Sequence, residues 1–97
     1  MEDFVYYNEL YDLYGALLTE KQRSYFEDYY FHNLSFSGMA ENYEVSRNAI
    51  FKQIKITKEK LGWFEEQLSL KKKKEKLESI ISKLDNQALK KELEELF

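Results

Sequence analysis

The sequence predicts an all-helical protein. Its 97 residues include no Pro and only three Gly, so few residues oppose helix formation. Hydrophobic residues make up 43% of the chain, which is enough for the core of one small domain. Apolar residues also recur at steps of three and four positions, the spacing of amphipathic helices. We therefore expect a helix-turn-helix bundle with a carboxy-terminal helical extension.

The first two expected helices lie in the amino-terminal third of the chain. Gly15 is expected to end or loosen the first of them. Residues Thr19 to Gln22 have the pattern of a capping box, in which the Thr19 hydroxyl accepts from a backbone amide and Gln22 reaches back to the Thr19 backbone. A second helix should begin there. The apolar positions of the two helices are Phe4, Tyr7, Leu10, Tyr11, Tyr14, Leu17, Leu18, Tyr25, Phe26, Tyr29, Tyr30 and Phe31.

Two Ser residues predict the starts of two further helices. Ser35 is a suitable N-cap for a short third helix, and Ser46 is one for a long fourth helix. Gly62 weakens the fourth helix by about 1 kcal/mol relative to Ala, so we expect a bend or an early end near Leu61. The core positions expected in these helices are Phe36, Met39, Ala40, Tyr43, Ala49, Ile50, Ile54, Thr57, Leu61, Phe64 and Leu68.

The segment from Thr19 to Leu61 has the residue spacing of a helix-turn-helix unit. Ala40 stands where two helices cross closely and a small side chain is needed. Val45 is expected to fill the turn, and Ile50 and Ile54 to bury the second helix against the first. The second helix of the unit, beginning at Ser46, is therefore expected to face a partner.

Glu44 departs from the usual pattern of such a turn. Gly is common there because the backbone tends to be left-handed, and another residue in that conformation costs roughly 1 kcal/mol. This cost suggests a turn of a different shape, without threatening the fold.

The carboxy-terminal third predicts two more amphipathic helices, or one with a break near Asp85 and Asn86. A polar run from Lys71 to Lys76 comes first, and Asp85 is the expected cap of the last helix. We assign residues 1–61 to a helix-turn-helix domain and residues 62–97 to a helical extension. The apolar positions beyond the polar run are Leu77, Ile80, Ile81, Leu84, Leu89, Leu93, Leu96 and Phe97.

The charge is distributed unevenly along the chain. The net charge of −3 is unpromising for a nucleic-acid binder. Residues 1–45, however, hold two basic and nine acidic residues, residues 46–76 hold ten basic and four acidic ones, and residues 77–97 hold three and five. The one positive segment therefore begins at the second helix of the helix-turn-helix unit.

Several side chains at the start of that helix should point away from the core. Helix-turn-helix proteins read base edges in the major groove with residues of this part of the second helix. Arg47 and Lys52 suit guanine or a phosphate, Asn48 suits adenine, and Phe51 suits a thymine methyl group. The candidate nucleic-acid-binding residues are Ser46, Arg47, Asn48, Phe51, Lys52, Gln53 and Lys55, with Ser46 and Gln53 at the margins.

Three segments resemble the YlxM family of small bacterial proteins, which itself resembles region four of sigma factors. They are residues 18–26 (Leu-Thr-Glu-Lys-Gln-Arg-Ser-Tyr-Phe), Leu34-Ser35, and residues 45–51 (Val-Ser-Arg-Asn-Ala-Ile-Phe). The similarity covers about residues 4–70. It implies a regulator or accessory factor of the signal recognition particle pathway, with DNA, the particle's RNA or the pathway's proteins as partners. It also implies a homodimer built through the carboxy-terminal helix, which agrees with the surplus of apolar positions from Phe64 onward.

A protein-docking use of the same helix stays open. Helix-turn-helix units also serve as protein-interaction modules, and the acidic residues 1–45 would repel a polyanion unless they lie on another face. The alternative function is thus an adaptor that docks a component of that pathway without binding nucleic acid. The Lys71 to Lys74 run is more often a solvated face than a phosphate site, and Tyr29 and Tyr30 are more often core than stacking platforms.

Catalysis has no support in the sequence. The absence of Cys excludes a disulfide framework and a thiolate metal site, and no Gly-rich phosphate loop or catalytic triad is present. His32, the single histidine, lies in a connection without partners at metal spacing. No cofactor, metal or membrane insertion is expected, and the cytoplasm is the expected location because neither a signal peptide nor a long apolar run is visible.

Overall fold

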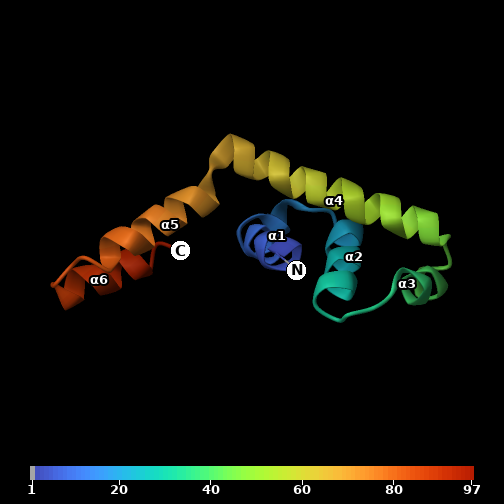
Figure 1. Cartoon of the computed structure of the whole chain (residues 1–97), viewed down its shortest axis with the longest axis horizontal. Helices are drawn as coiled ribbons and strands as arrows, with labels where there is room; N and C mark the ends of the chain where they lie inside the picture. The colour runs from blue at the N-terminus through green and yellow to red at the C-terminus, as the bar shows by residue number, and fades with distance from the viewer. Residues whose placement is uncertain (1) are drawn as a thin grey trace.

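The computed structural model describes residues 2–97, with side chains from Phe4 onward, and this range is helical without a strand (Figure 1). The predicted all-helical class is therefore confirmed. The molecule is elongated, with extents of 54 × 25 × 24 Å. Its elements are α1 (Glu2–Tyr14), the 3-10 helix η1 (Gly15–Leu17), α2 (Glu20–Tyr30), α3 (Phe36–Tyr43), α4 (Arg47–Leu68), α5 (Leu70–Ile81) and α6 (Gln87–Glu94).

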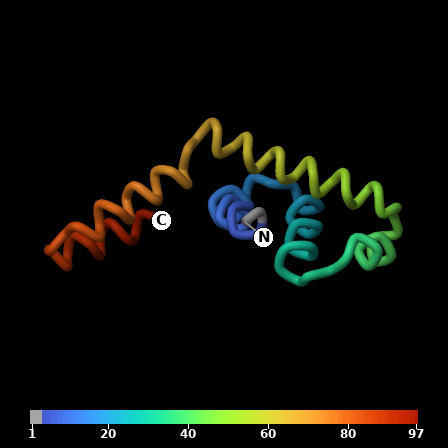
Figure 2. Tube along the Cα trace, in the orientation of Figure 1, coloured from blue at the N-terminus to red at the C-terminus, as the bar shows by residue number. Residues whose placement is uncertain are grey.

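Helix α4 is the element around which the rest is arranged. It contacts α1, α2 and α3, which lie together along one side of it, while α5 and α6 extend away from its carboxyl end (Figures 1 and 2). The buried core lies between α4 and the three shorter helices, and aromatic rings fill much of it. The Phe26 ring stacks on Tyr11 and on Tyr30, with centroids 4.5 and 4.3 Å apart. The expectation that Tyr30 belongs to the core is confirmed.

The two amino-terminal helices follow most of the predicted pattern. Helix α1 ends at Tyr14, immediately before Gly15, and the capping box at the start of α2 is present. The amide of Gln22 donates to the Thr19 hydroxyl, and the Thr19 amide donates to the Gln22 side chain, both at 3.1 Å. Leu17 was expected on the buried face but is exposed, because η1 changes the helical period after Gly15.

Helix α4 continues unbroken to Leu68, so the expected early end near Leu61 is wrong. Gly62 lies within it, and a Cβ atom built at Gly62 meets nothing within 4 Å. The small penalty of one Gly is offset by the burial of the residues around it, including Leu61. The boundary assigned between residues 61 and 62 stays a prediction, although it falls inside a continuous helix.

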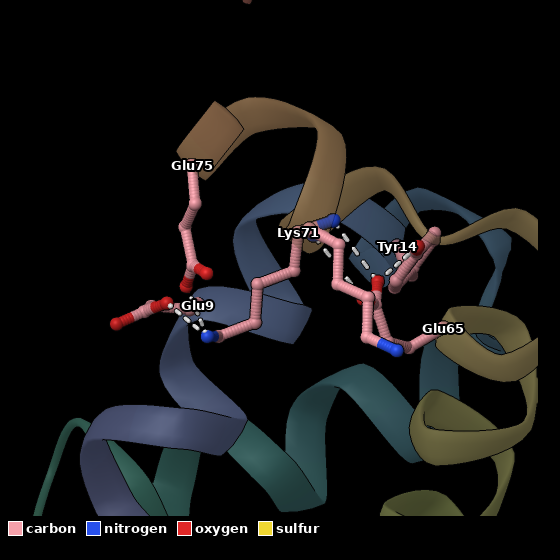
Figure 3. A network of polar contacts seen from close by, with 6 residues as sticks. Glu9, Tyr14, Glu65, Lys71 and Glu75 are labelled. Carbon is pink, nitrogen blue, oxygen red and sulfur yellow. Dashed lines mark hydrogen bonds and ion pairs between the residues drawn. The ribbon is translucent and has the colours of Figure 1, made fainter. Parts of the chain in front are cut away.

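The chain changes direction at Ser69, which separates α4 from α5. Ser69 is in the left-handed region, with φ 53°, and its side chain makes no cap hydrogen bond. The Tyr14 hydroxyl instead accepts from the Leu70 amide at 3.1 Å and donates to the Glu65 carboxylate at 2.7 Å (Figure 3). Glu65 also accepts from the amides of Lys71 and Lys72, at 3.0 and 3.4 Å.

These contacts form a joint, which we define as Tyr14, Glu65 and the first three amides of α5. The first amides of a helix have no partner within the helix, and here side chains from α1 and α4 supply their acceptors. A negative carboxylate also suits the positive end of the helix dipole. Glu9 and Glu75 hold the side chain of Lys71 beside this joint (Figure 3). The direction of α5 is thus set by α1 and α4 together.

Helices α5 and α6 form a hairpin that packs on itself more than on the bundle (Figure 2). The two-helix alternative is confirmed, but the expected cap at Asp85 is wrong. Asn86 caps α6 instead, and its side-chain oxygen accepts from the Leu89 amide at 3.0 Å. A cap must accept from the amide three residues ahead, and α6 begins one residue later than expected. None of the residues in α5 or α6 is buried.

Replacement of Gly62 by Ala should stabilise the protein by about 1 kcal/mol, because Ala is the better helix former and its Cβ meets no neighbour. Urea denaturation followed by circular dichroism measures the change. Gly15→Ala is the matched control, since a Cβ there lies 3.1 Å from the Tyr11 ring and should give no gain. A Gly62→Ala protein that is less stable than the parent would contradict this reading.

Protonation of Glu65 should weaken the joint. Burial alone would raise the pKa of Glu65, but the hydrogen bonds from Tyr14, Lys71 and Lys72 and the charge of Lys71 outweigh it, so the pKa lies below 4.5. A carboxyl group whose pKa is lowered on folding stabilises the folded protein at pH values above its pKa in the unfolded chain. This stabilisation is lost as the pH falls through the pKa of the group in the folded protein.

Glu65→Gln should therefore be less stable than the parent by about 1–3 kcal/mol at neutral pH, with the difference shrinking in acid below pH 4.5. Urea denaturation at several pH values measures it. Glu66→Gln, at an exposed neighbouring carboxylate, serves as the control. A difference between parent and Glu65→Gln that does not change with pH would argue against the ionised joint.

Candidate nucleic-acid interface

The turn between α3 and α4 orients the candidate interface. Glu44 has φ 56° and ψ 45°, so the backbone is left-handed as in the usual turn, and the different shape that its side chain suggested is wrong. The Val45 amide donates to the Ala40 carbonyl at 3.1 Å and the Glu44 amide to the Glu41 carbonyl at 3.4 Å. These two bonds form a Schellman cap, which compensates the cost of the left-handed residue.

Val45 does not fill the turn as expected, because its side chain is 38% exposed. Its amide closes the cap at the outside of the turn, which leaves the side chain partly in solvent. Met39 of α3 and Ile50 of α4 are fully buried and make the core of the two helices instead. Ala40 is half-buried against that core, as a small residue at a helix crossing should be.

Ser46 is the N-cap of α4, as predicted. Its hydroxyl accepts from the Ala49 amide at 3.0 Å, and its backbone is extended, with φ −75° and ψ 156°. The hydroxyl is therefore occupied in positioning the helix. The first amides of α4 add a positive dipole at this end, where anions are favoured.

The predicted recognition residues face outward. Ile50 and Ile54 are buried beneath them, whereas Gln53 is half-buried at the margin of the surface. This arrangement confirms the predicted orientation of α4, while contact with nucleic acid stays a prediction. The exposed members of the candidate set are Ser46, Arg47, Asn48, Phe51, Lys52 and Lys55.

Three of the outward residues and the half-buried Lys58 form a stripe along α4. Arg47, Phe51 and Lys55 are separated by four positions each, and Lys58 follows three positions later, so all of them lie near one line on the helix surface. Asn48 and Lys52 form a parallel row beside it. We call Arg47, Phe51, Lys55 and Lys58 the α4 stripe, which carries three cations and one aromatic ring.

The α4 stripe leads to an aromatic cavity of about 390 Å³ between α4 and the three short helices. Phe51 meets the Phe36 ring edge to face at 6.1 Å, and Phe36 stacks on Tyr29 at 4.8 Å. The sequence did not predict this site. The spacing of Phe51, Lys55 and Lys58 indicates only the α4 side of it, because the other lining residues come from other helices. Its wall includes Tyr7, Tyr29, Phe36, Phe51, Lys55 and Lys58.

Two of the acidic residues in the segment 1–45, which would repel a polyanion, make hydrogen bonds within the protein. Glu27 accepts from the Tyr11 hydroxyl and Asp28 from the Tyr43 hydroxyl. Burial, and then the hydrogen bond to the carboxylate, raises the pKa of each of these two Tyr hydroxyls to about 12. Asp28 also lies 3.2 Å from the Nδ1 atom of the exposed His32. These carboxylates therefore stabilise the bundle as well as adding negative charge.

The Lys run on α5 is divided between two roles. Lys71 is half-buried, lies 3.4 Å from a Glu9 carboxylate oxygen and pairs with Glu75, so it belongs to the joint. Lys72 and Lys73 are exposed to solvent, as a charged helix face usually is. Lys71 is thus not the freely solvated residue that the run suggested, because α1 lies beside it.

None of the helices described between residues 2 and 97 has the combined length and hydrophobicity that a membrane span requires. Among the side chains described from Phe4 onward, no group of three or more His, Asp or Glu residues is placed to hold a metal ion.

The short helix α3, the capped left-handed turn at Glu44 and the long helix α4, with its exposed amino-terminal face, together form a helix-turn-helix. Residues 1–97 match the family described as UPF0122, "Putative helix-turn-helix protein, YlxM / p13 like". The chain belongs to this family, which confirms the resemblance seen in the sequence. The family is described by its helix-turn-helix and not by any enzymatic reaction.

Curated relatives agree with this membership. A UPF0122 protein of Listeria welshimeri is 44% identical over 84 residues, 87% of this chain and 76% of the relative. One from Geobacillus kaustophilus is 47% identical over 77 residues, 79% of this chain and 70% of the relative. One from Halalkalibacterium halodurans is 44% identical over 90 residues, 89% and 83% of the two chains.

Proposed function

We propose that this protein is a non-enzymatic, sigma-region-four-like regulator or accessory factor that binds nucleic acid through α4. The observation that carries the proposal is the exposed, basic amino-terminal half of α4 above the buried Ile50 and Ile54. Lysine and arginine side chains neutralise phosphates, and the outward rows of the helix can enter a major groove. Membership of a helix-turn-helix family supports this use of the helix.

The process that we propose is the signal recognition particle pathway, with DNA or the particle's RNA as the nucleic acid. This part rests on the resemblance of residues 18–26 and 45–51 to the YlxM family. The nucleic-acid contacts that we propose are made by Ser46, Arg47, Asn48, Phe51, Lys52, Gln53 and Lys55.

A second candidate function is a protein adaptor that docks a component of the same pathway through α4. Glu41 in the last turn of α3 and Glu44 in the following turn favour it, because both are exposed shortly before Arg47 in the chain and would repel a phosphate backbone. A protein surface with basic residues would be tolerated there. The two functions predict different responses to salt.

Affinity for a duplex DNA or for the particle's RNA should fall steeply as salt rises, because bound phosphates release counterions. The double variant Arg47→Ala with Lys52→Ala should lose most of the binding and have a shallower salt slope. Fluorescence anisotropy at two salt concentrations measures both. Lys73→Ala, at an exposed Lys of α5, is the control for the loss of one positive charge outside α4. Undetectable binding of both nucleic acids at low salt would reject this function in favour of the adaptor.

We also propose that α5 and α6 pair with a second copy of the chain. Ile80, Leu89, Leu96 and Phe97 are all more than 40% exposed, and an exposed row of large apolar side chains usually marks an interface.

Leu89→Gln together with Leu96→Gln should therefore reduce the mass measured by light scattering from that of a dimer to that of a monomer. Val5→Gln changes an apolar residue of α1 that is about as exposed as Leu96, and it should leave the mass unchanged. A parent protein that is monomeric at micromolar concentration would contradict the proposal, and a dimer that survives the tail substitutions would place the interface elsewhere.

A further inference from the structure

The aromatic cavity beside α4 has the size of a small-ligand site. Its volume of about 390 Å³ lies within the range of pockets that bind small molecules, roughly 300–1,000 Å³. Rings from four helices form its wall, and they include Tyr7 from α1, Tyr29 from α2, Phe36 from α3 and Phe51 from α4. Phe51 is 51% exposed, so part of its ring is open to a ligand.

The same cavity has cations in its wall. Lys55 is exposed, and the Lys58 ammonium lies 4.9 Å from the centroid of the Tyr7 ring. The Lys58 ammonium thus lies against the aromatic wall. An aromatic wall beside the exposed cation of Lys55 suits a ligand that has both a flat ring and an anion.

The cavity and the proposed recognition surface share residues of α4. Arg47, Phe51, Lys55 and Lys58 make the α4 stripe, which runs from the first turn of α4 to the cavity. The distance along the helix from residue 47 to residue 58 is about 16 Å at 1.5 Å per residue. A strand of nucleic acid that follows the stripe would therefore bring its next nucleotides to the cavity.

We propose that the cavity receives one unstacked base from a single-stranded or looped nucleic acid, with a neighbouring phosphate at the exposed Lys55. This inference rests on the proposed nucleic-acid function of α4 and adds a second contact to it. Aromatic stacking with cationic side chains along the backbone is how proteins hold single strands. Glu59 also lines the cavity and supplies an acceptor for a base amino group.

A base with its phosphate fits this site better than an apolar peptide side chain. The aromatic side chain of a peptide would fill the cavity but has no anion at a fixed distance for Lys55. A nucleotide has both groups in one unit. The paired base of an intact duplex cannot enter, so the cavity should distinguish single-stranded from duplex nucleic acid.

The test compares a short single-stranded RNA of mixed sequence, the DNA of the same sequence and the corresponding duplex DNA, by fluorescence anisotropy at low salt. Phe36→Leu and Tyr29→Leu each remove one ring of the wall and keep an apolar side chain. Trp63→Leu, at an exposed aromatic residue of α4 outside this cavity, is the matched control. Circular dichroism establishes which variants fold, and two wall variants are used so that one folded variant suffices.

Each folded wall variant should bind the single strands about tenfold more weakly and the duplex as before, because stacking on one ring contributes this much per base. Trp63→Leu should bind all three like the parent. Equal loss for RNA and DNA would assign the contact to the base and phosphate that they share, and loss for RNA alone would add its sugar hydroxyl.

Two results would overturn the inference, and they are distinguishable. Unchanged single-strand affinity in the wall variants of a protein that binds the duplex would reject the cavity, leave the proposed function standing and favour a protein side chain as the occupant. A parent protein that binds neither single strands nor duplex at low salt would reject the cavity and the proposed function together.

Discussion

The structure depends on the carboxylate of Glu65, which is buried where α1, α4 and α5 meet. The Glu65 carboxylate accepts from the Tyr14 hydroxyl and from the amides of Lys71 and Lys72, and the Tyr14 hydroxyl accepts from the Leu70 amide. Without these acceptors the first amides of α5 would be unsatisfied, and nothing else at Ser69 caps them. The joint therefore determines where the hairpin of α5 and α6 points, and it links the hairpin to the aromatic core through Tyr14. The pKa of Glu65 stays below 4.5 because these donors outweigh the cost of burial.

Helix α4 connects the joint at Glu65 with the helix-turn-helix at the other end of the molecule. It runs without a break from the Ser46 cap to Leu68, and α1, α2 and α3 all pack on it. Its buried side holds the bundle together, whereas its opposite side at the amino end is basic and exposed. One helix thus provides the core, the candidate nucleic-acid surface and one wall of the aromatic cavity. The proposed base contact and the proposed groove contact therefore share a single rigid element.

Much of this fold could be predicted because it is local. The capping box at Thr19, the Ser46 cap and the apolar stripe of α4 each depend on residues within one or two helical turns. The structure confirms them, except that Leu68 at the end of the stripe is exposed. The errors arose where distant contacts decide. Burial along α4 outweighs the penalty of Gly62, and the partner of Glu65 is 51 positions away in the sequence. The orientation of Arg47 and Lys52 could likewise be predicted from spacing. The cavity could not be predicted, because its rings come from α1, α2, α3 and α4, and only the packing of these helices brings the rings together.

The central claim is that the exposed face of α4 meets nucleic acid. Amide chemical-shift mapping by NMR tests it most directly, with the protein titrated by duplex DNA and by single-stranded RNA at low salt. If this face binds, the largest changes should fall between residues 46 and 58, with smaller changes in α5 and α6. Largest changes in residues 70–97, or no changes with either nucleic acid, would contradict it.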